Sequence, residues 1–366
     1  MARPILQGES SFEGHSSSSP GTTTPDPIYI FLSYHRVYPS YFSFISSVSS
    51  ITIPKTLKEA LDHPGWRQTM ISEIQALDHN KTWELIPLPS GKKTVGCRWV
   101  YAIKVGPNGE VDRLKARLVA KGYTQIYGLD YSGSFSPVAK MTTVKLFLAM
   151  AAIRHWPLHQ LDTKNAFLHG DLKEKVYMEQ PPGFVAQGES GLVCKLRRSL
   201  YGLKQSPRAW FGKFSHIVQN FGLKRSEADH SVFYCLTSPE KCVYLIVYVD
   251  DIVITGNDVG KISQLKEHLC HHFQTKDLGT LKYFLGIEVA QSKEGVVISQ
   301  RKYALDILKE TGMIDCKAVD CPMDPNQKLM AEQGEVFSDP ERYRRLVGNL
   351  FILLLPDQIY PLQLVL

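Results

Sequence analysis

Regularly spaced cysteines, long apolar runs and a strong charge excess are largely missing from this chain of 366 residues. The seven cysteines are scattered, with no Cys-x-x-Cys pair and no ladder of Cys and His, so no zinc-finger spacing exists and a reducing compartment is favoured. The apolar stretch at 28–51 is interrupted by His35, Arg36 and repeated serines, which excludes a membrane span and a signal peptide. The net charge of +6 is too modest to establish nucleic-acid binding by itself. We therefore expect an intracellular protein without a membrane partner.

The most informative segment that is present runs from Val243 to Thr255 and holds the pair Asp250-Asp251 between apolar, β-branched stretches. Tyr, Val and Ile on both sides predict two buried strands of a hairpin. Two carboxylates about 4 Å apart repel by roughly 4 kcal/mol at an effective dielectric constant near 20. Mg²⁺, which binds a few carboxylates together with substrate phosphates, is the usual compensating charge. On this segment alone, solvated turn residues remain an equal alternative.

Three further segments add to that pair. Asp162 follows a short apolar stretch and precedes a polar turn, and Ser199–Trp210 indicates a glycine-containing loop that leads into a helix. Upstream, Arg113–Val119 is basic with a strand-like alternation. Lys115 and Arg117 are two positions apart, so a strand would present both on one face.

In this order and spacing, the chain closely resembles the reverse transcriptase domain in the Pol polyprotein of copia-type long-terminal-repeat retrotransposons. The resemblance covers about residues 55 to 349. Each motif alone is a weak signal, whereas the ordered set is very specific. The set comprises Trp99–Tyr101, Lys115–Gln125, Phe135–Val138, Val176–Phe184, Tyr248–Asp251 and Tyr283–Glu288.

The resemblance implies an α+β fold of the right-hand polymerase type, with fingers, an antiparallel-sheet palm and a partial thumb. It divides the chain into a disordered or linker segment at 1–53, fingers and palm at 54–310, and a partial thumb at 311–350. Residues 351–366 are expected to be a frameshifted tail. The location implied is cytoplasmic, within particles, or nuclear.

The activity implied is RNA-directed DNA polymerase, which transfers nucleotides to the 3′ end of a primer with two metal ions. The expected catalytic residues are Asp162, Asp250 and Asp251. The same three, with the backbone carbonyl of Thr163, are the expected ligands of two Mg²⁺ ions, for which Mn²⁺ is a possible substitute.

The implied partners are an RNA or DNA template with its primer and deoxynucleoside triphosphates, and the sequence favours no oligomeric state. Phe167 is expected to exclude a ribose 2′ hydroxyl, and Gly202 to leave room for a base where a Cβ would not fit. Lys276 or Lys282 is a candidate proton donor to the leaving pyrophosphate. The residues expected at the nucleotide are Lys115, Arg117, Asn165, Ala166, Phe167, Tyr201 and Gly202, and those expected at template or primer are Lys204, Gln205, Tyr248, Phe284, Leu285 and Gly286.

Other interpretations stay open at this point. The basic strand is also compatible with a solvated charged face, and Phe167 with a core aromatic residue. The whole chain is alternatively an inactive transposon remnant that at most binds primer-template. An unrelated metal-dependent phosphohydrolase would share the carboxylates, but it would not explain the glycine loop or the segment from Tyr283 to Glu288.

The segment after Leu350 departs from the family. Relatives continue with a string such as Tyr-Leu-Thr-Val-Thr-Arg-Pro-Asp-Ile-Ser-Phe-Ala. One back-translation of Phe351–Gln363, read in a shifted frame, encodes that string. The sequence therefore predicts a frameshift near Leu350, a tail not selected to pack, and the loss of the downstream RNase H domain.

Periodicity also predicts individual elements. A Pro-Asn-Gly turn at 107–109 is expected between two strands. The helices are expected near 56–61, 66–77, 143–155, 260–272 and 300–311, and the strands near 83–86, 98–105 and 114–121.

Overall fold

The computed structural model of the chain describes residues 52–105, 111–185, 191–319, 326, 328, 330 and 339–354. The expected linker at 1–53, apart from its last two residues, the turn at 107–109 and the tail from 355 onward lie outside the described residues. The chain divides into two units. The smaller one comprises 1–53 with 103–113, and the larger one comprises 54–102 with 114–366.

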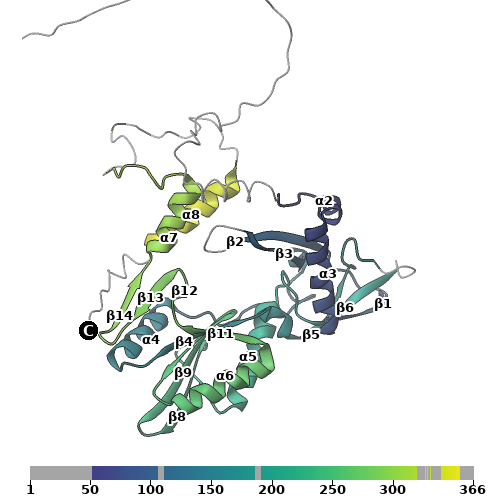
Figure 1. Cartoon of the computed structure of the whole chain (residues 1–366). Coiled ribbons are helices and arrows are strands. Elements are labelled where there is room, and N and C mark those ends of the chain that lie inside the picture. Colours follow the sequence, from purple (N-terminus) through teal and green to yellow (C-terminus); the bar gives the residue numbers. More distant parts are fainter. Residues whose placement is uncertain are drawn as a thin grey trace, which may run out of the picture. The chain divides into compact units, whose positions relative to one another are not determined.

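The larger unit is organised around a six-stranded antiparallel sheet with the strand order β11-β4-β10-β9-β8-β7 (Figure 1). Strand β4 comes early in the chain but pairs with two strands that follow it much later, so the sheet depends on long-range contacts. Its strands are β4 (Leu158–Thr163), β7 (Lys224–Arg225), β8 (Val232–Ser238), β9 (Lys241–Tyr248), β10 (Asp251–Gly256) and β11 (Thr275–Thr280).

Both faces of this sheet are covered. Helices α5 (Ser206–Asn220) and α6 (Val259–Phe273) pack on one face, where Trp210, Phe214 and Leu265 are buried against strand residues such as Ile252. Helix α4 (Met141–Ile153) and a small sheet pack on the other face, which buries Val253. Consecutive residues of β10 therefore face different cores, which explains why the strand reads as a continuous apolar run.

The small sheet contains β12 (Tyr283–Phe284), β13 (Ile287–Gln291) and β14 (Val296–Ser299), in that order. Two helices follow it, α7 (Arg301–Thr311) and α8 (Pro340–Leu354). The Arg345 guanidinium of α8 donates a hydrogen bond of 2.6 Å to the Glu310 carboxylate of α7. Helix α8 continues past Leu350, where the frameshift was expected, and Phe351 within it is exposed.

A third sheet has the order β1-β6-β5, with β1 (Trp83–Pro87), β6 (Leu192–Arg198) and β5 (Asp171–Met178). Its core includes Leu77 of helix α3, Leu118 and Leu168. The remaining elements are helices α2 (Leu57–Asp62) and α3 (Pro64–His79), the two-stranded sheet of β2 (Cys97–Val105) and β3 (Val111–Ala120), and the 3₁₀ turns η3 (Gly122–Thr124) and η4 (Ala166–His169).

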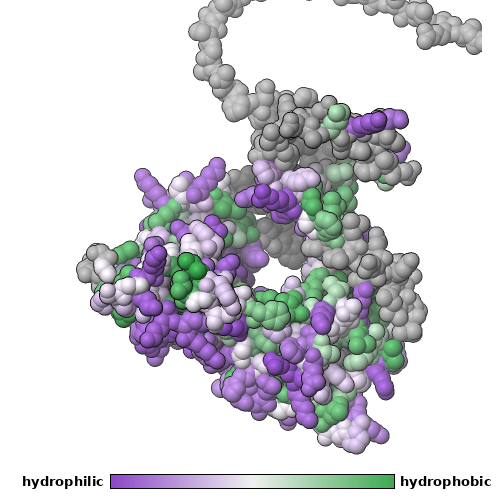
Figure 2. Space-filling model, turned by 180° about the vertical axis from the view of Figure 1, so that it is seen from behind, coloured by the Kyte–Doolittle hydropathy of each residue, from purple (hydrophilic) through white to green (hydrophobic). Residues whose placement is uncertain are grey.

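The fold is thus a mixture of helices and antiparallel sheets, and the helices expected near 143–155, 260–272 and 300–311 are confirmed to within about two residues. No helix in the described ranges is both long enough and apolar enough to span a membrane. Figure 2 shows one face of the molecule, on which hydrophilic side chains alternate with hydrophobic patches.

Candidate active site

Two of the three predicted acidic residues lie opposite each other on neighbouring strands. Asp162 of β4 is the direct pairing partner of Asp251 of β10. Directly opposed residues of an antiparallel pair point to the same face, with Cβ atoms about 4.5–5.5 Å apart. The sheet therefore brings together two carboxylates that are distant in the sequence.

The third acidic residue, Asp250, lies with Val249 in the two-residue turn between β9 and β10. Val249 has φ +55°, a conformation that is strained for a β-branched residue. Two hydrogen bonds hold this turn. The Trp210 indole N–H donates to the Val249 carbonyl at 2.7 Å, and the Thr163 backbone N–H donates to the Asp250 carbonyl at 2.8 Å. The prediction that the acidic pair lies at the bend of a hairpin is confirmed.

The three carboxylates influence one another electrostatically. Burial, and then the charge of Asp250, raise the pKa of Asp251 to about 6. Burial and Asp250 also raise the pKa of Asp162, while the cations of Lys115 and Lys276 act in the opposite direction. Raised pKa values mean that the ionised cluster is destabilised, and a bound cation would offset that cost.

The side chains of the three acidic residues are not arranged as one set of metal ligands in the structure. Among the described residues, no three His, Cys, Asp or Glu side chains are grouped so that they could hold a metal ion. The Asp251 carboxylate instead accepts a hydrogen bond of 3.4 Å from the Gln160 amide. The expected pairing of the two strands is confirmed, and the role of the three carboxylates as metal ligands stays a prediction. The carboxylate oxygens themselves are the donors that Mg²⁺ prefers.

In strand β3, cationic and buried residues alternate, as the sequence pattern predicted. Ala116 and Leu118 are buried, whereas Lys115 and Arg117 lie on the opposite, half-buried face. The Arg117 guanidinium lies over the Tyr201 ring, 4.4 Å from its centroid. Such a cation–π contact orients the guanidinium without using its hydrogen-bond donors.

Phe167 continues this arrangement. Its ring meets the Tyr201 ring edge-on with centroids 5.3 Å apart, and its carbonyl accepts a hydrogen bond from the Ser199 hydroxyl. Asn165, just before it, has φ +54°, and Ala166 is buried with only 2% of its surface exposed. Phe167 also lines a cavity of about 190 Å³ together with Val249 of the acidic turn. It is therefore both a core contact and a residue at the edge of the site.

The loop from Tyr201 to Gln205 requires one correction and adds one explanation. Gly202 has φ +91°, and a Cβ there would lie 2.1 Å from the Ala120 carbonyl oxygen, so close packing against β3 already requires a glycine, and its approach to a base stays a prediction. Gln205 has no exposed surface, and its amide oxygen accepts a hydrogen bond of 3.1 Å from the Gln125 side chain. Direct contact of Gln205 with template is therefore wrong for this arrangement. Lys204 is exposed beside it.

The turn between β12 and β13 is formed by Leu285 (φ +53°) and Gly286 (φ +81°). Both residues are partly exposed, whereas Phe284 before them is 1% exposed and belongs to the core. The Phe284 ring packs edge-on against Tyr248, with centroids 6.5 Å apart. The expectation that Phe284 contacts a primer is therefore also wrong for this arrangement, in which Phe284 supports the turn from below.

The sequence model of the family described as "Reverse transcriptase (RNA-dependent DNA polymerase)" matches residues 80–325, more than half of the chain. The chain belongs to this family. The site residues described above from Lys115 to Gly286 all lie within the matched part of the chain.

Two relatives are polyproteins of plant transposons. The chain is 46% identical over 310 residues to the retrovirus-related Pol polyprotein from transposon RE1 of Arabidopsis thaliana, a match over 84% of the chain and 21% of the relative. It is 38% identical over 328 residues to that from transposon TNT 1-94 of Nicotiana tabacum, over 86% of the chain and 24% of the relative. The chain thus spans between a fifth and a quarter of the length of these relatives.

A solved structure described as the foamy viral protease-reverse transcriptase with double-stranded DNA matches 68% of the chain and 39% of that structure, at 14% identity and a TM-score of 0.35. A TM-score this low does not allow individual helices or strands to be matched between the two structures.

Two residues near the acidic hairpin and the basic strand were not predicted from the sequence. Glu73 of α3 is a partly buried carboxyl whose pKa is raised by burial, while a hydrogen bond from the Leu118 backbone and the charges of Arg117 and Lys115 act to lower it. Gln160 lies two positions before Asp162 and is 8% exposed. Neither residue belongs to a recognisable sequence motif. Each lies near the site because of packing between elements that are far apart in the sequence. A polar residue at an otherwise apolar strand position was the available signal for Gln160.

Proposed function

We propose that this chain contains the polymerase core of a reverse transcriptase that extends a primer 3′ end on a nucleic-acid template. Residues 54–310 would form the fingers and palm, and 311–350 part of the thumb. The observation that carries the proposal is the pairing of Asp162 with Asp251 beside the Asp250 turn. Family membership supports the same reaction class.

In this proposal Asp162, Asp250 and Asp251, with the backbone carbonyl of Thr163, hold two Mg²⁺ or Mn²⁺ ions. Such ions activate the primer hydroxyl and stabilise the leaving pyrophosphate. The raised pKa of Asp251, about 6, supports this role, because a carboxylate that is costly to ionise alone gains most from a cation.

The nucleotide would bind between the basic strand and η4. Lys115 and Arg117 contact its phosphates, and the Tyr201 ring keeps the Arg117 guanidinium in place. Phe167, packed against Tyr201, lies beside the sugar and excludes a 2′ hydroxyl. Asn165 and Ala166 contribute backbone groups, and Gly202 allows the loop to approach β3.

The primer would end between the acidic turn and the Leu285-Gly286 turn. Tyr248 and the Leu285-Gly286 backbone support its last nucleotide, and Phe284 fixes that turn to the core. Lys204, which is exposed beside the glycine loop, would contact the template.

Primer extension by the purified chain, with Mg²⁺ and deoxynucleoside triphosphates on RNA and DNA templates, tests the proposal. We expect extension by the wild type and none by Asp250→Asn. Asp171→Asn is the matched control, because Asp171 is an exposed carboxylate that pairs with Lys213 and has no role in the proposed site, and it should retain activity. Equal extension by all three proteins would show a contaminating polymerase, and no extension by the wild type would contradict the proposal.

A second candidate is a remnant that binds primer-template without extending it. The basic face of β3, with Lys115 and Arg117, would support such binding without catalysis. Retention of labelled duplex that falls steeply with salt, without any extension, would identify this case.

The frameshift near Leu350 remains part of the proposal. It rests on the shifted-frame back-translation of Phe351–Gln363. Sequencing the locus is the test, and a reading frame without the shifted family string would contradict it.

A further inference from the structure

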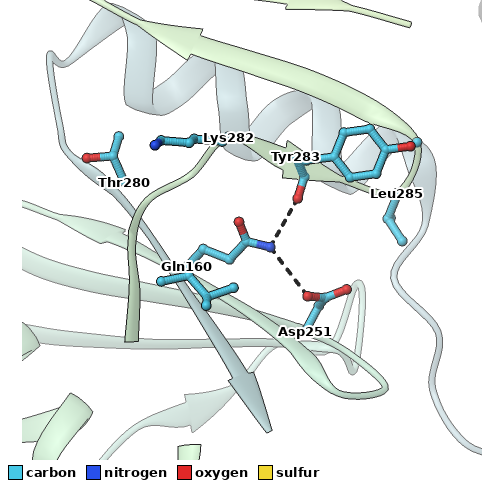
Figure 3. A pocket seen from close by; sticks show the side chains of 8 residues that line it. Gln160, Asp251, Thr280, Lys282, Tyr283 and Leu285 are labelled. Carbon is cyan, nitrogen blue, oxygen red and sulfur yellow. Dashed lines mark hydrogen bonds between the residues drawn. The ribbon is translucent and has the colours of Figure 1, made fainter. Parts of the chain in front are cut away.

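A pocket of about 500 Å³ lies beside the acidic hairpin, on the face of the sheet that carries Asp162 and Asp251. Figure 3 shows Gln160 in the middle of this pocket, with its amide nitrogen between two partners. The lining residues are Gln160, Asp251, Leu278, Thr280, Lys282, Tyr283, Leu285 and Gly286.

The Gln160 side chain of β4 links β12 to β10, two strands that belong to different sheets. Its amide donates to the Tyr283 backbone carbonyl at 3.0 Å and to the Asp251 carboxylate at 3.4 Å (Figure 3). An amide has two N–H donors, so both bonds form at once. The shorter bond orients the amide, and the second N–H is thereby directed at the carboxylate.

An irregularity in β11 brings the Tyr283 segment within reach of Gln160. Asp277 pairs with Leu161 and Gly279 pairs with Gln160, which leaves Leu278 as an extra residue, a β-bulge. Bulges bend a strand and are common next to active sites, where they redirect the chain. Here the strand leads into Tyr283 and the Leu285-Gly286 turn, which close over the Gln160 side of the pocket.

We propose that Gln160 is a positioning residue that keeps the Tyr283–Gly286 turn in register with the Asp251 carboxylate. The inference rests on the proposed function, in which this turn supports the primer end and Asp251 is a metal ligand. One amide then sets the distance between the primer support and the reaction centre. A misplacement of about 1 Å at such a centre costs as much as about 100-fold in rate.

The chain provides a matched control at the other end of β4. The Gln291 amide of β13 donates to the Trp156 carbonyl at 2.7 Å and accepts from the Leu158 backbone N–H at 3.2 Å. Gln291 therefore also ties the small sheet to the start of β4, but it makes no contact with the acidic residues in the bonds that are described. Met in place of either Gln keeps the side-chain length and removes the hydrogen bonds.

Single-turnover extension compares wild type, Gln160→Met and Gln291→Met after titration of the active fraction. For Gln160→Met we expect a rate about tenfold lower on a matched primer end, with nucleotide affinity within about twofold of wild type. The loss should be smaller on a mismatched primer end, which is already misplaced. Gln291→Met should stay within about twofold on both primers. Equal losses in the two variants, or equal losses on both primer ends, would overturn the inference.

Hydrogen exchange of the segment 283–287 in the presence of primer-template gives a readout that needs no catalysis. Exchange should be faster in Gln160→Met than in wild type or Gln291→Met, and unchanged exchange would overturn the inference. If the wild type fails to extend primers, the proposed function fails by that result alone. The exchange data then still decide whether Gln160 holds the turn.

Discussion

Strand β4 has very different neighbours on its two sides. On one side, β10 is a central strand whose residues 252–256 are all buried, and it places an acidic residue, Asp251, opposite Asp162. On the other side, β11 is an edge strand that is exposed after its first residue, and it places a basic residue, Lys276, opposite the same Asp162.

This difference shows that a rigid central strand and a more deformable edge strand lie on the two sides of β4. A strand packed between two cores fixes its backbone, so the acidic hairpin is held to within small displacements. An edge strand with a bulge tolerates bending, and β11 uses it to lead the chain into the pocket beside Asp251. In the proposed function, the central side would supply the reacting geometry, and the edge side a counter-charge and the support for the primer.

The largest effect is expected from removing the charge of Asp162, which lies opposite both Asp251 and Lys276. Asp162→Asn keeps the shape of the side chain and removes its charge. We expect primer extension to fall by about 10³-fold or more, since a metal-held charge is worth several kcal/mol in the transition state. The melting temperature should not fall, because the substitution also removes repulsion from Asp250. Extension within tenfold of wild type would contradict the assigned role.

The central side can be tested through its stability. The pKa of Asp251 is raised to about 6 from an ordinary value of 3.8, so the folded chain binds the proton more tightly than the unfolded chain. The contribution of Asp251 to wild-type stability should therefore fall as the pH rises from about 4 to about 6 and stay lowered above that range. The full shift corresponds to about 3 kcal/mol, which solvent screening of this partly exposed group reduces to about 1–2 kcal/mol.

Asp251→Asn should remove that cost. Without divalent metal, the variant should melt at a higher temperature than wild type at pH 7.5, and the difference should shrink below about pH 6. Thermal melts with a chelator across this range give the measurement. A variant that is no more stable than wild type at pH 7.5 would show that the carboxylate carries no such cost.

On the edge side, Lys276→Met removes the cation opposite Asp162. Since Lys276 lowers the pKa of Asp162, the substitution should raise it, and the acid limb of the extension rate should move to higher pH. We expect the rate near neutral pH to fall by about threefold, with Lys276→Arg close to wild type. Loss of the alkaline limb of the wild-type pH profile in Lys276→Met, with no shift of the acid limb, would instead identify Lys276 as a proton donor to pyrophosphate.

The sequence predicted the parts of this site that depend on local pattern. The acidic pair lies in a hairpin because apolar, β-branched residues flank it, and Lys115 and Arg117 share a face because strands alternate. It did not predict that β11 pairs with the far side of β4, since such long-range pairing is not encoded in any single segment.

The burial of Gln205 and Phe284 was missed for a related reason. Both lie inside motifs that the resemblance assigned to nucleic-acid contact, and a motif does not specify which of its side chains point inward. Gln125 and Tyr248, the partners that determine their orientation, come from other elements.

The smallest expected effects concern the bulge of β11. The Asp277 carboxylate accepts a hydrogen bond of 2.8 Å from the Gly279 N–H and pairs with the Lys266 ammonium at 3.0 Å. Asp277→Ala should lower the free energy of unfolding by about 1 kcal/mol, because the bulge loses the hydrogen bond that closes it. Lys266→Met removes only the partly exposed ion pair and should cost less than about 0.5 kcal/mol, a cost that should vanish at high salt. Chemical denaturation of both variants gives the comparison, and an equal loss in the two would show that the ion pair, not the bulge closure, stabilises this edge.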